Sequence, residues 1–210
     1  MAIKPIKLAQ KPLKWALKLS GMGCNRPNST ESNYTLNSII YLGLDLSTTA
    51  SGWAVLNDKM KLIDYGVVVP DPKGQLFDRI IQIRNEIVRK LILFKPTFVA
   101  IEDLISMKFG RTAKVLNYLN GVIACCCYEY NGNDVYFIAS SSLKKAIGVN
   151  PMALKKDGFD REGIKEICFK KISELFRVKL RNEMEIKYKF DIADSIACVY
   201  KLYQNTGGKL

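Results

Sequence analysis

Short apolar runs that each end in an acidic residue place the strongest constraint on how this chain folds. Residues 39–44 form one such run, which stops at Asp45, and residues 97–101 form another, which stops at Glu102. A continuous apolar run of this length, bounded by turn residues, is typical of a strand buried on both faces of a sheet. The two acids are therefore expected at the ends of central strands, where α/β proteins build their sites.

The period of the apolar residues changes along the chain, and this change indicates a mixed sheet. Residues 53–56 and 62–69 follow the first strand across tight turns, which predicts an antiparallel meander of three strands. The later strand candidates alternate with segments whose apolar residues recur at helical spacing, as expected for parallel strands joined by right-handed crossovers. We predict an α/β fold with a five-stranded mixed sheet flanked by helices. The remaining predicted strands are 97–101 and 135–138, and the predicted helices are 76–94, 111–130, 140–147, 161–176 and 191–203.

The balance of charge points to an anionic partner. The chain has 210 residues with 32 Lys and Arg against 20 Asp and Glu, a net charge of +12, and nucleic acid is the commonest partner for such a surplus. Residues 1–31 hold six basic groups and one acid, and residues 140–189 hold thirteen basic groups and seven acids. We predict a basic N-terminal extension, residues 1–37, that is flexible or contacts DNA, with organelle targeting as the alternative, and a folded domain over residues 38–206.

Several classes of protein and site are excluded by composition. No apolar run approaches the ~20 residues of a membrane-spanning helix. Histidine is absent, which excludes imidazole bases and ligands, so that any metal must be held by oxygen, as suits Mg²⁺ or Mn²⁺. The cysteines form no Cys-x-x-Cys pair, and the three adjacent ones, Cys125 to Cys127, are predicted to be small buried side chains in a reducing compartment, most simply the cytoplasm. The cysteines of the chain are Cys24, Cys125, Cys126, Cys127, Cys168 and Cys198.

Two further acids complete a candidate set of four carboxylates. Asp191 and Asp194 are three residues apart in a predicted helix and so share one face of it. Gathered with Asp45 and Glu102 at one sheet edge, they would repel one another unless divalent cations were bound. Two such ions are suited to phosphodiester cleavage without a histidine. Taken singly, each acid also fits an ordinary turn or helix cap.

Three motifs resemble those of the RuvC-like Holliday junction resolvases. Residues 41–54 (YLGLDLSTTASGWA) are similar to the opening strand and turn of that family, residues 99–102 (VAIE) to its second acidic motif, and residues 191–197 (DIADSIA) to its closing motif. The resemblance covers about residues 39–204. It implies an RNase H-like nuclease domain, a homodimer, and nicking of four-way DNA junctions in recombination or replication, without a nucleotide cofactor. Two Mg²⁺ ions, replaceable by Mn²⁺, would be held by Asp45, Glu102, Asp191 and Asp194.

The same resemblance suggests where DNA is contacted. Residues 140–148 (SSSLKKAIG) resemble the family segment that precedes a basic DNA-facing loop, which implies phosphate contacts by Lys144, Lys145, Lys155 and Lys156. A solvated surface is the alternative for these lysines. The family usually has an aromatic residue three positions after the glutamate. Here that position is Ile105, with Phe109 nearby as a substitute, and both are predicted DNA contacts.

Three other functions remain open from the sequence. Sugar kinases and actin-like ATPases share the fold and a similar first loop, but they need a second lobe and a second Gly-rich phosphate loop. A non-catalytic DNA-binding protein explains the basic charge but not four acids beside a polyanion. A nuclease of the same chemistry that acts on flaps, forks or RNA fits every residue pattern named above.

Overall fold

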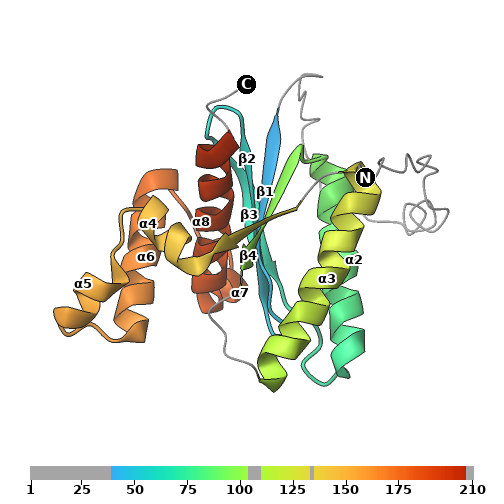
Figure 1. The fold of residues 1–210 in the computed structure, drawn as a ribbon, viewed down its shortest axis with the longest axis horizontal. Helices are drawn as coiled ribbons and strands as arrows, with labels where there is room; N and C mark the ends of the chain where they lie inside the picture. Colours follow the sequence, from blue (N-terminus) through green and yellow to red (C-terminus); the bar gives the residue numbers. More distant parts are fainter. Residues whose placement is uncertain (1–38, 104–109, 133–134, 207–210) are drawn as a thin grey trace, which may run out of the picture. The chain divides into compact units, whose positions relative to one another are not determined.

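The computed structural model of the protein describes residues 39–103, 110–132 and 135–206 (Figure 1). The chain divides after residue 36 into two units, and all the described residues belong to the second. The N-terminal extension predicted over residues 1–37, together with Ile105 and Phe109, lies outside the described residues.

The core of the fold is a five-stranded mixed sheet, as predicted. Its strands lie in the order β3-β2-β1-β4-β5. Strand β1 pairs antiparallel with β2 and parallel with β4, and the outer pairs β2–β3 and β4–β5 are antiparallel and parallel, respectively. The strands are β1 (Ile40–Asp45), β2 (Ser51–Asn57), β3 (Leu62–Val68), β4 (Phe98–Asp103) and β5 (Val135–Ala139).

The helices include two short ones that the sequence periodicity does not predict, α5 and α7. Each has fewer than two turns, too short for an apolar period to be recognised. The last helix begins at Lys189, so Asp191 lies within its first turn rather than at its N-cap. The helices are α2 (Leu76–Phe94), α3 (Arg111–Asn131), α4 (Ser140–Ala146), α5 (Pro151–Lys156), α6 (Arg161–Phe176), α7 (Glu183–Lys187) and α8 (Lys189–Thr206).

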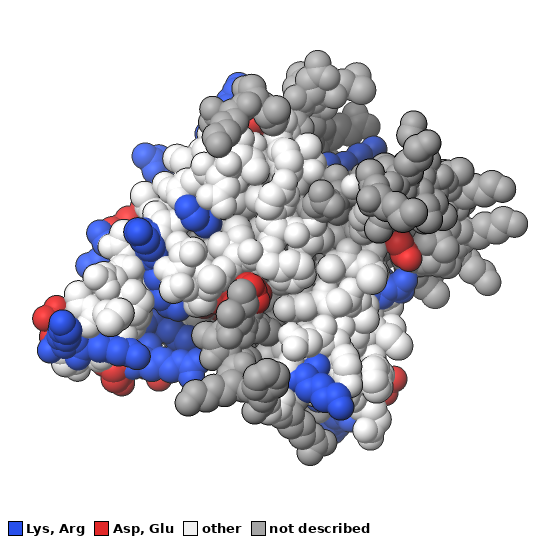
Figure 2. All heavy atoms as spheres, viewed as in Figure 1, with Lys and Arg blue, Asp and Glu red and all other residues white. Residues whose placement is uncertain are grey.

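The helices cover the sheet on both faces, with α2 and α3 on one side and α4, α6 and α8 on the other (Figure 1). Because successive side chains of a strand point to opposite faces of the sheet, β1 packs against the helices on both faces. Leu42 and Leu44 pack with α2 and α3, whereas Tyr41 packs with α8. This two-sided burial explains why the sequence of β1 is a continuous apolar run. On the face drawn in Figure 2, Lys and Arg side chains gather on the side formed by α4, α5 and α6.

Two glycines let α8 lie directly on the sheet. A Cβ atom added to Gly43 would lie 2.5 Å from the carbonyl oxygen of Ser195 and from the amide nitrogen of Val199. At Gly52 it would lie 2.0 Å from the carbonyl oxygen of Asp191. Any larger residue at these positions would push the helix backbone away, so the two glycines allow α8 to pack closely on β1 and β2.

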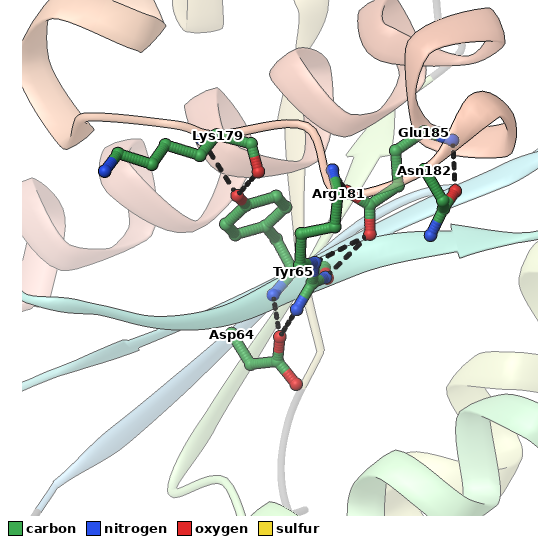
Figure 3. A network of polar contacts seen from close by, with 6 residues as sticks. All are labelled: Asp64, Tyr65, Lys179, Arg181, Asn182 and Glu185. Atoms are coloured by element: carbon green, nitrogen blue, oxygen red, sulfur yellow. Dashed lines mark hydrogen bonds and ion pairs between the residues drawn. The ribbon is translucent and has the colours of Figure 1, made fainter.

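An arginine clasp fastens the connection between α6 and α8 to the edge strand β3 (Figure 3). The Arg181 guanidinium donates hydrogen bonds to Asp64 at 2.9 Å, to Glu185 at 2.9 Å, and to the carbonyl oxygen of Tyr65. The Glu185 carboxylate also accepts the Arg181 backbone N–H at 2.7 Å. Alongside, the Tyr65 hydroxyl donates to the carbonyl oxygen of Lys179 at 2.5 Å. The chain segment that leads into α8 is thereby held against the sheet.

The variant Arg181→Ala is expected to lower the free energy of unfolding by about 2–3 kcal/mol, because it leaves the buried Glu185 carboxylate without its cation. This value lies at or below the lower end of the range for broken buried pairs, because Arg181 itself is half exposed and its charge is screened by solvent. Urea unfolding measures the effect. Lys179→Ala is the matched control, since Lys179 joins this network only through its backbone. Equal stability of the two variants would show that the clasp contributes little.

Two observations bear on expectations about membrane spans and cysteines. Within the described residues, no helix combines the length and the apolar character needed to cross a membrane. Cys126 and Cys127 are buried and free, as expected, but the prediction of burial is wrong for Cys125, which is exposed. Adjacent positions on a helix point in directions about 100° apart, so three in a row cannot all face the core.

Candidate active site

Three of the four predicted carboxylates meet at one edge of the sheet. Oxygen atoms of Asp45, Glu102 and Asp194 all lie within 4.8 Å of one another, and all three residues are partly buried. Strand pairing brings the first two together, because Leu44 of β1 stands beside Ile101 of the parallel strand β4. The next residue of each strand is the acid.

Helix α8 supplies the third carboxylate. Asp194 follows Asp191 by almost one helical turn, and the backbone at Asp191 is pressed against Gly52. Because Gly52 is the register partner of Asp45, this contact brings the start of α8 beside the last residue of β1. Asp191 is not one of the three acids within 4.8 Å. It lies alongside them, close enough for its charge to act on both Asp45 and Asp194.

The turn after Asp45 is held by its own hydroxyl groups. The Ser51 hydroxyl donates to the carbonyl oxygen of Ser47 at 2.7 Å and accepts the Ser47 backbone N–H at 3.1 Å. The Ser47 and Thr49 hydroxyls lie 2.9 Å apart. On the neighbouring helix, Arg79 donates to the carbonyl oxygen of Thr48 at 3.3 Å. These bonds fix the path of the chain directly after the Asp45 carboxylate.

The surroundings of these carboxyl groups disfavour their ionised form. Burial raises the pKa of Asp45 well above that of an ordinary aspartate, and the charges of Glu102, Asp194 and Asp191 raise it further. Burial and the Glu102 charge raise the pKa of Asp194 to about 7. Packed carboxylates of this kind are compensated when a cation binds, and an all-oxygen set of donors suits a hard divalent ion. The donor chemistry therefore fits a divalent metal.

A lysine that the sequence patterns do not single out also reaches the site. Lys165 of α6 acts on Asp191 and Asp194, where its positive charge opposes the effect of burial on the pKa. It lines a small cavity of about 30 Å³ beside the acids, together with Lys144, Cys168, Phe190, Ala193 and Asp194. Lys165 differs from the other basic residues of this region because α6 packs on α8 and so brings it to the acids. The spacing of residues in the sequence does not predict this packing.

The four lysines predicted to contact DNA lie on α4 and α5. Lys144 is partly buried, donates to the Ser140 hydroxyl at 2.8 Å, and borders the cavity beside Asp194. Lys145, Lys155 and Lys156 are exposed. The structure thus places one of the four next to the carboxylates and the other three on the surrounding surface.

Similarity to known proteins identifies the family of this chain. Residues 41–158 match the family model described as crossover junction endodeoxyribonuclease RuvC. Proteins of that name from Myxococcus xanthus and Ehrlichia ruminantium are each 25% identical to this chain, over 74% of it and over 75% and 91% of their own lengths. The solved structure of Thermus thermophilus RuvC superposes with a TM-score of 0.57 at 18% identity, over 80% of this chain and 97% of that one, which shows a shared fold. The chain therefore belongs to the RuvC family.

Proposed function

We propose that this protein is a metal-dependent endonuclease that resolves four-way DNA junctions by hydrolysing phosphodiester bonds. The observation that carries the proposal is the convergence of Asp45, Glu102 and Asp194 at one sheet edge. The curated relatives are named crossover junction endodeoxyribonucleases, and their activity is carried over to this chain as part of the proposal.

In this proposal the carboxylates hold two Mg²⁺ ions, which Mn²⁺ can replace. Asp45, Glu102 and Asp194 provide the central oxygen ligands, and Asp191 adds a fourth carboxylate at the side. Such a pair of ions supplies an activated water and charge compensation for the leaving oxygen. The protein's own contribution is to keep the carboxylate oxygens fixed on two strands and a helix, so that they need not reorganise during the reaction.

The basic residues around the carboxylates position the DNA backbone. Lys144 and Lys165 flank Asp194 and offset the repulsion between the acids and an approaching phosphate. Lys145, Lys155 and Lys156 extend the positive surface away from the acids. Contacts of this type hold the backbone without reading base sequence, as a structure-selective nuclease requires.

A homodimer is part of the proposal, and the outer surface of α2 and α3 supports it. The described residues expose an apolar group there, with Phe77 and Ile81 on α2 and Tyr118 and Val122 on α3. The Phe77 and Tyr118 rings stack with their centroids 6.5 Å apart, and the space around Gly121 is open. Small and aromatic residues on one helical face suit close packing against a second copy.

Light scattering tests the dimer. It should give twice the chain mass of 23.7 kDa; a monomeric mass would contradict the dimer.

The experiment that tests the function compares DNA substrates. Labelled four-way junction, fork and plain duplex are each incubated with the protein, once with Mg²⁺ and once with a chelator. We expect paired nicks near the crossover of the four-way junction, formed only with Mg²⁺. Tight binding without cleavage would instead indicate a DNA-binding protein. Equal cutting of fork and duplex would indicate a nuclease with another substrate.

A further inference from the structure

Helix α5 and the first turn of α6 form a short helical hairpin, residues 150–163, which we name the α5–α6 arm. Its geometry is fixed by capping. The Asn150 side chain accepts hydrogen bonds from the backbone at Met152 and Ala153 at 3.1 and 3.3 Å. Gly158 turns the chain with a φ of 89°, and the Phe159 backbone N–H donates to the carbonyl oxygen of Leu154 at 3.0 Å. The tip of the arm is therefore a defined surface rather than a loose loop.

Two large apolar side chains project from this arm into solvent. Met152 is 75% exposed, and Phe159 is 45% exposed. The Phe159 ring rests on the first turn of α6, because a Cβ atom at Gly163 would lie 3.3 Å from its Cδ1 atom. Leu154 and Ile164 anchor the base of the arm in the core. The arm thus holds two exposed apolar side chains on a rigid support, Met152 at the start of α5 and Phe159 directly after the turn at Gly158.

Exposed charges of both signs lie along the arm. Lys155, Lys156 and Arg161 are exposed and form no ion pair within the described part of the chain, and Asp157, Asp160 and Glu162 are exposed as well. The nearby Asp160 carboxylate is engaged in capping α6, where it accepts the Gly163 backbone N–H at 2.7 Å. Exposed cations around exposed apolar groups are the composition of a surface that binds nucleic acid.

The arm is continuous with the carboxylate site. Arg161 and Lys165 lie one turn apart on α6, a rise of roughly 6 Å, and Lys165 lines the same small cavity as Asp194. A DNA strand whose phosphate lies at the carboxylates would therefore continue past α6 toward the tip. The basic side chains along this path, from Lys165 through Arg161 to Lys155 and Lys156, have no ion-pair partner among the described residues, and they favour DNA as the occupant of the surface.

We propose that the α5–α6 arm is a branch-reading element, in which Met152 and Phe159 contact bases left open near the branch point while the lysines hold phosphates. The inference rests on the proposed function and goes beyond it, because it assigns selectivity for branched DNA to residues outside the carboxylate site. Apolar and aromatic side chains can enter or stack on base steps that are already opened, and they gain little from intact duplex. Phosphate contacts alone do not make this distinction.

The test measures DNA affinity of the full chain in the presence of a chelator, so that no cleavage occurs. Fluorescence anisotropy is recorded for a labelled four-way junction and a duplex of equal length at several KCl concentrations. The double variant Met152→Ala/Phe159→Ala is compared with Lys155→Ala/Lys156→Ala. Leu93→Ala serves as a matched control, because Leu93 is 68% exposed and lies near the end of α2 away from the arm. Thermal melts check that each variant is folded.

We expect Met152→Ala/Phe159→Ala to bind the junction about tenfold more weakly, with nearly unchanged duplex affinity and an unchanged salt slope. The lysine variant should weaken both complexes and reduce the salt slope by about 0.9 for each phosphate that is no longer neutralised. The control should match the wild type. Met152→Ala alone, at a position outside the core, should show the same junction-specific loss to a smaller degree even if the double variant folds poorly.

Two results would overturn the inference without touching the proposed function. One is wild-type junction affinity in the Met152→Ala/Phe159→Ala variant. The other is an equal loss for junction and duplex, which would make the arm a nonselective contact. A wild-type protein that binds junction and duplex equally would instead overturn the proposed function, and the inference with it.

Discussion

Replacing Asp45 with asparagine is expected to abolish DNA cleavage while leaving junction binding intact or tighter. Asp45 is the last residue of β1 and shares the 4.8 Å cluster with Glu102 and Asp194. Asparagine keeps the shape of the side chain but removes the charge that a divalent cation requires. The loss of rate should be roughly 1,000-fold or more, which corresponds to about 4 kcal/mol. Binding should not suffer, since one negative charge beside a polyanion is removed.

The same substitution has a consequence that is measurable without DNA. In the metal-free protein, Asp45→Asn should raise the melting temperature, because it relieves repulsion within a buried cluster of acids. Adding Mg²⁺ should then stabilise the wild type more than the variant. Asp58→Asn is the control, because Asp58 is an exposed acid in the turn between β2 and β3. Nicking by Asp45→Asn at the wild-type rate would remove this residue from the reaction.

A single added methyl group at Gly52 should be nearly as damaging to cleavage as loss of a carboxylate. The new Cβ atom would lie 2.0 Å from the Asp191 carbonyl oxygen, so the start of α8 must move away from β2. Gly52→Ala should lower the free energy of unfolding by about 3 kcal/mol. It should also reduce cleavage strongly, because Asp194 is carried away from Asp45 and Glu102.

Gly66→Ala separates these two effects. Gly66 lies on β3, and the three atoms nearest to a Cβ added there all belong to the Trp53 side chain, the first at 3.0 Å, rather than to the backbone of α8. This control should lose some stability in urea unfolding but keep its nicking rate on a four-way junction. If Gly52→Ala cleaved the junction as fast as Gly66→Ala, the close contact between α8 and Gly52 would not be needed for cleavage.

The sheet could be predicted from the sequence because its central strands carry two signals at once. Strand β1 is apolar on both faces and ends in an acid, so both its burial and the position of Asp45 are encoded locally. The pairing of β1 with β4 then follows from the parallel crossover and brings Glu102 to the same edge. Asp194 could be predicted as a candidate from its spacing to Asp191 on a helix, and the family motif agrees, but the periodicity of that helix does not say where it docks on the sheet.

What the sequence did not predict depends on packing between distant elements. Lys165 acquires its place beside Asp194 only when α6 packs on α8. The clasp through Arg181 joins residues more than a hundred positions apart, and no local pattern indicates such a pairing. Helix α5 is too short for a periodic signal and is defined instead by its Asn150 cap. These features are non-local, so residue spacing carries no information about them.

The docking of α8 also determines when the protein becomes able to cut. Strands β1 and β4 supply two of the three clustered acids, so any form of the chain in which α8 is not docked lacks the third. In that form Asp45 and Glu102 lie at the ends of their strands, exposed to solvent on the side that α8 would cover. Nuclease competence should thus arise at a late step of folding, and recovery of nicking during refolding would report that step directly.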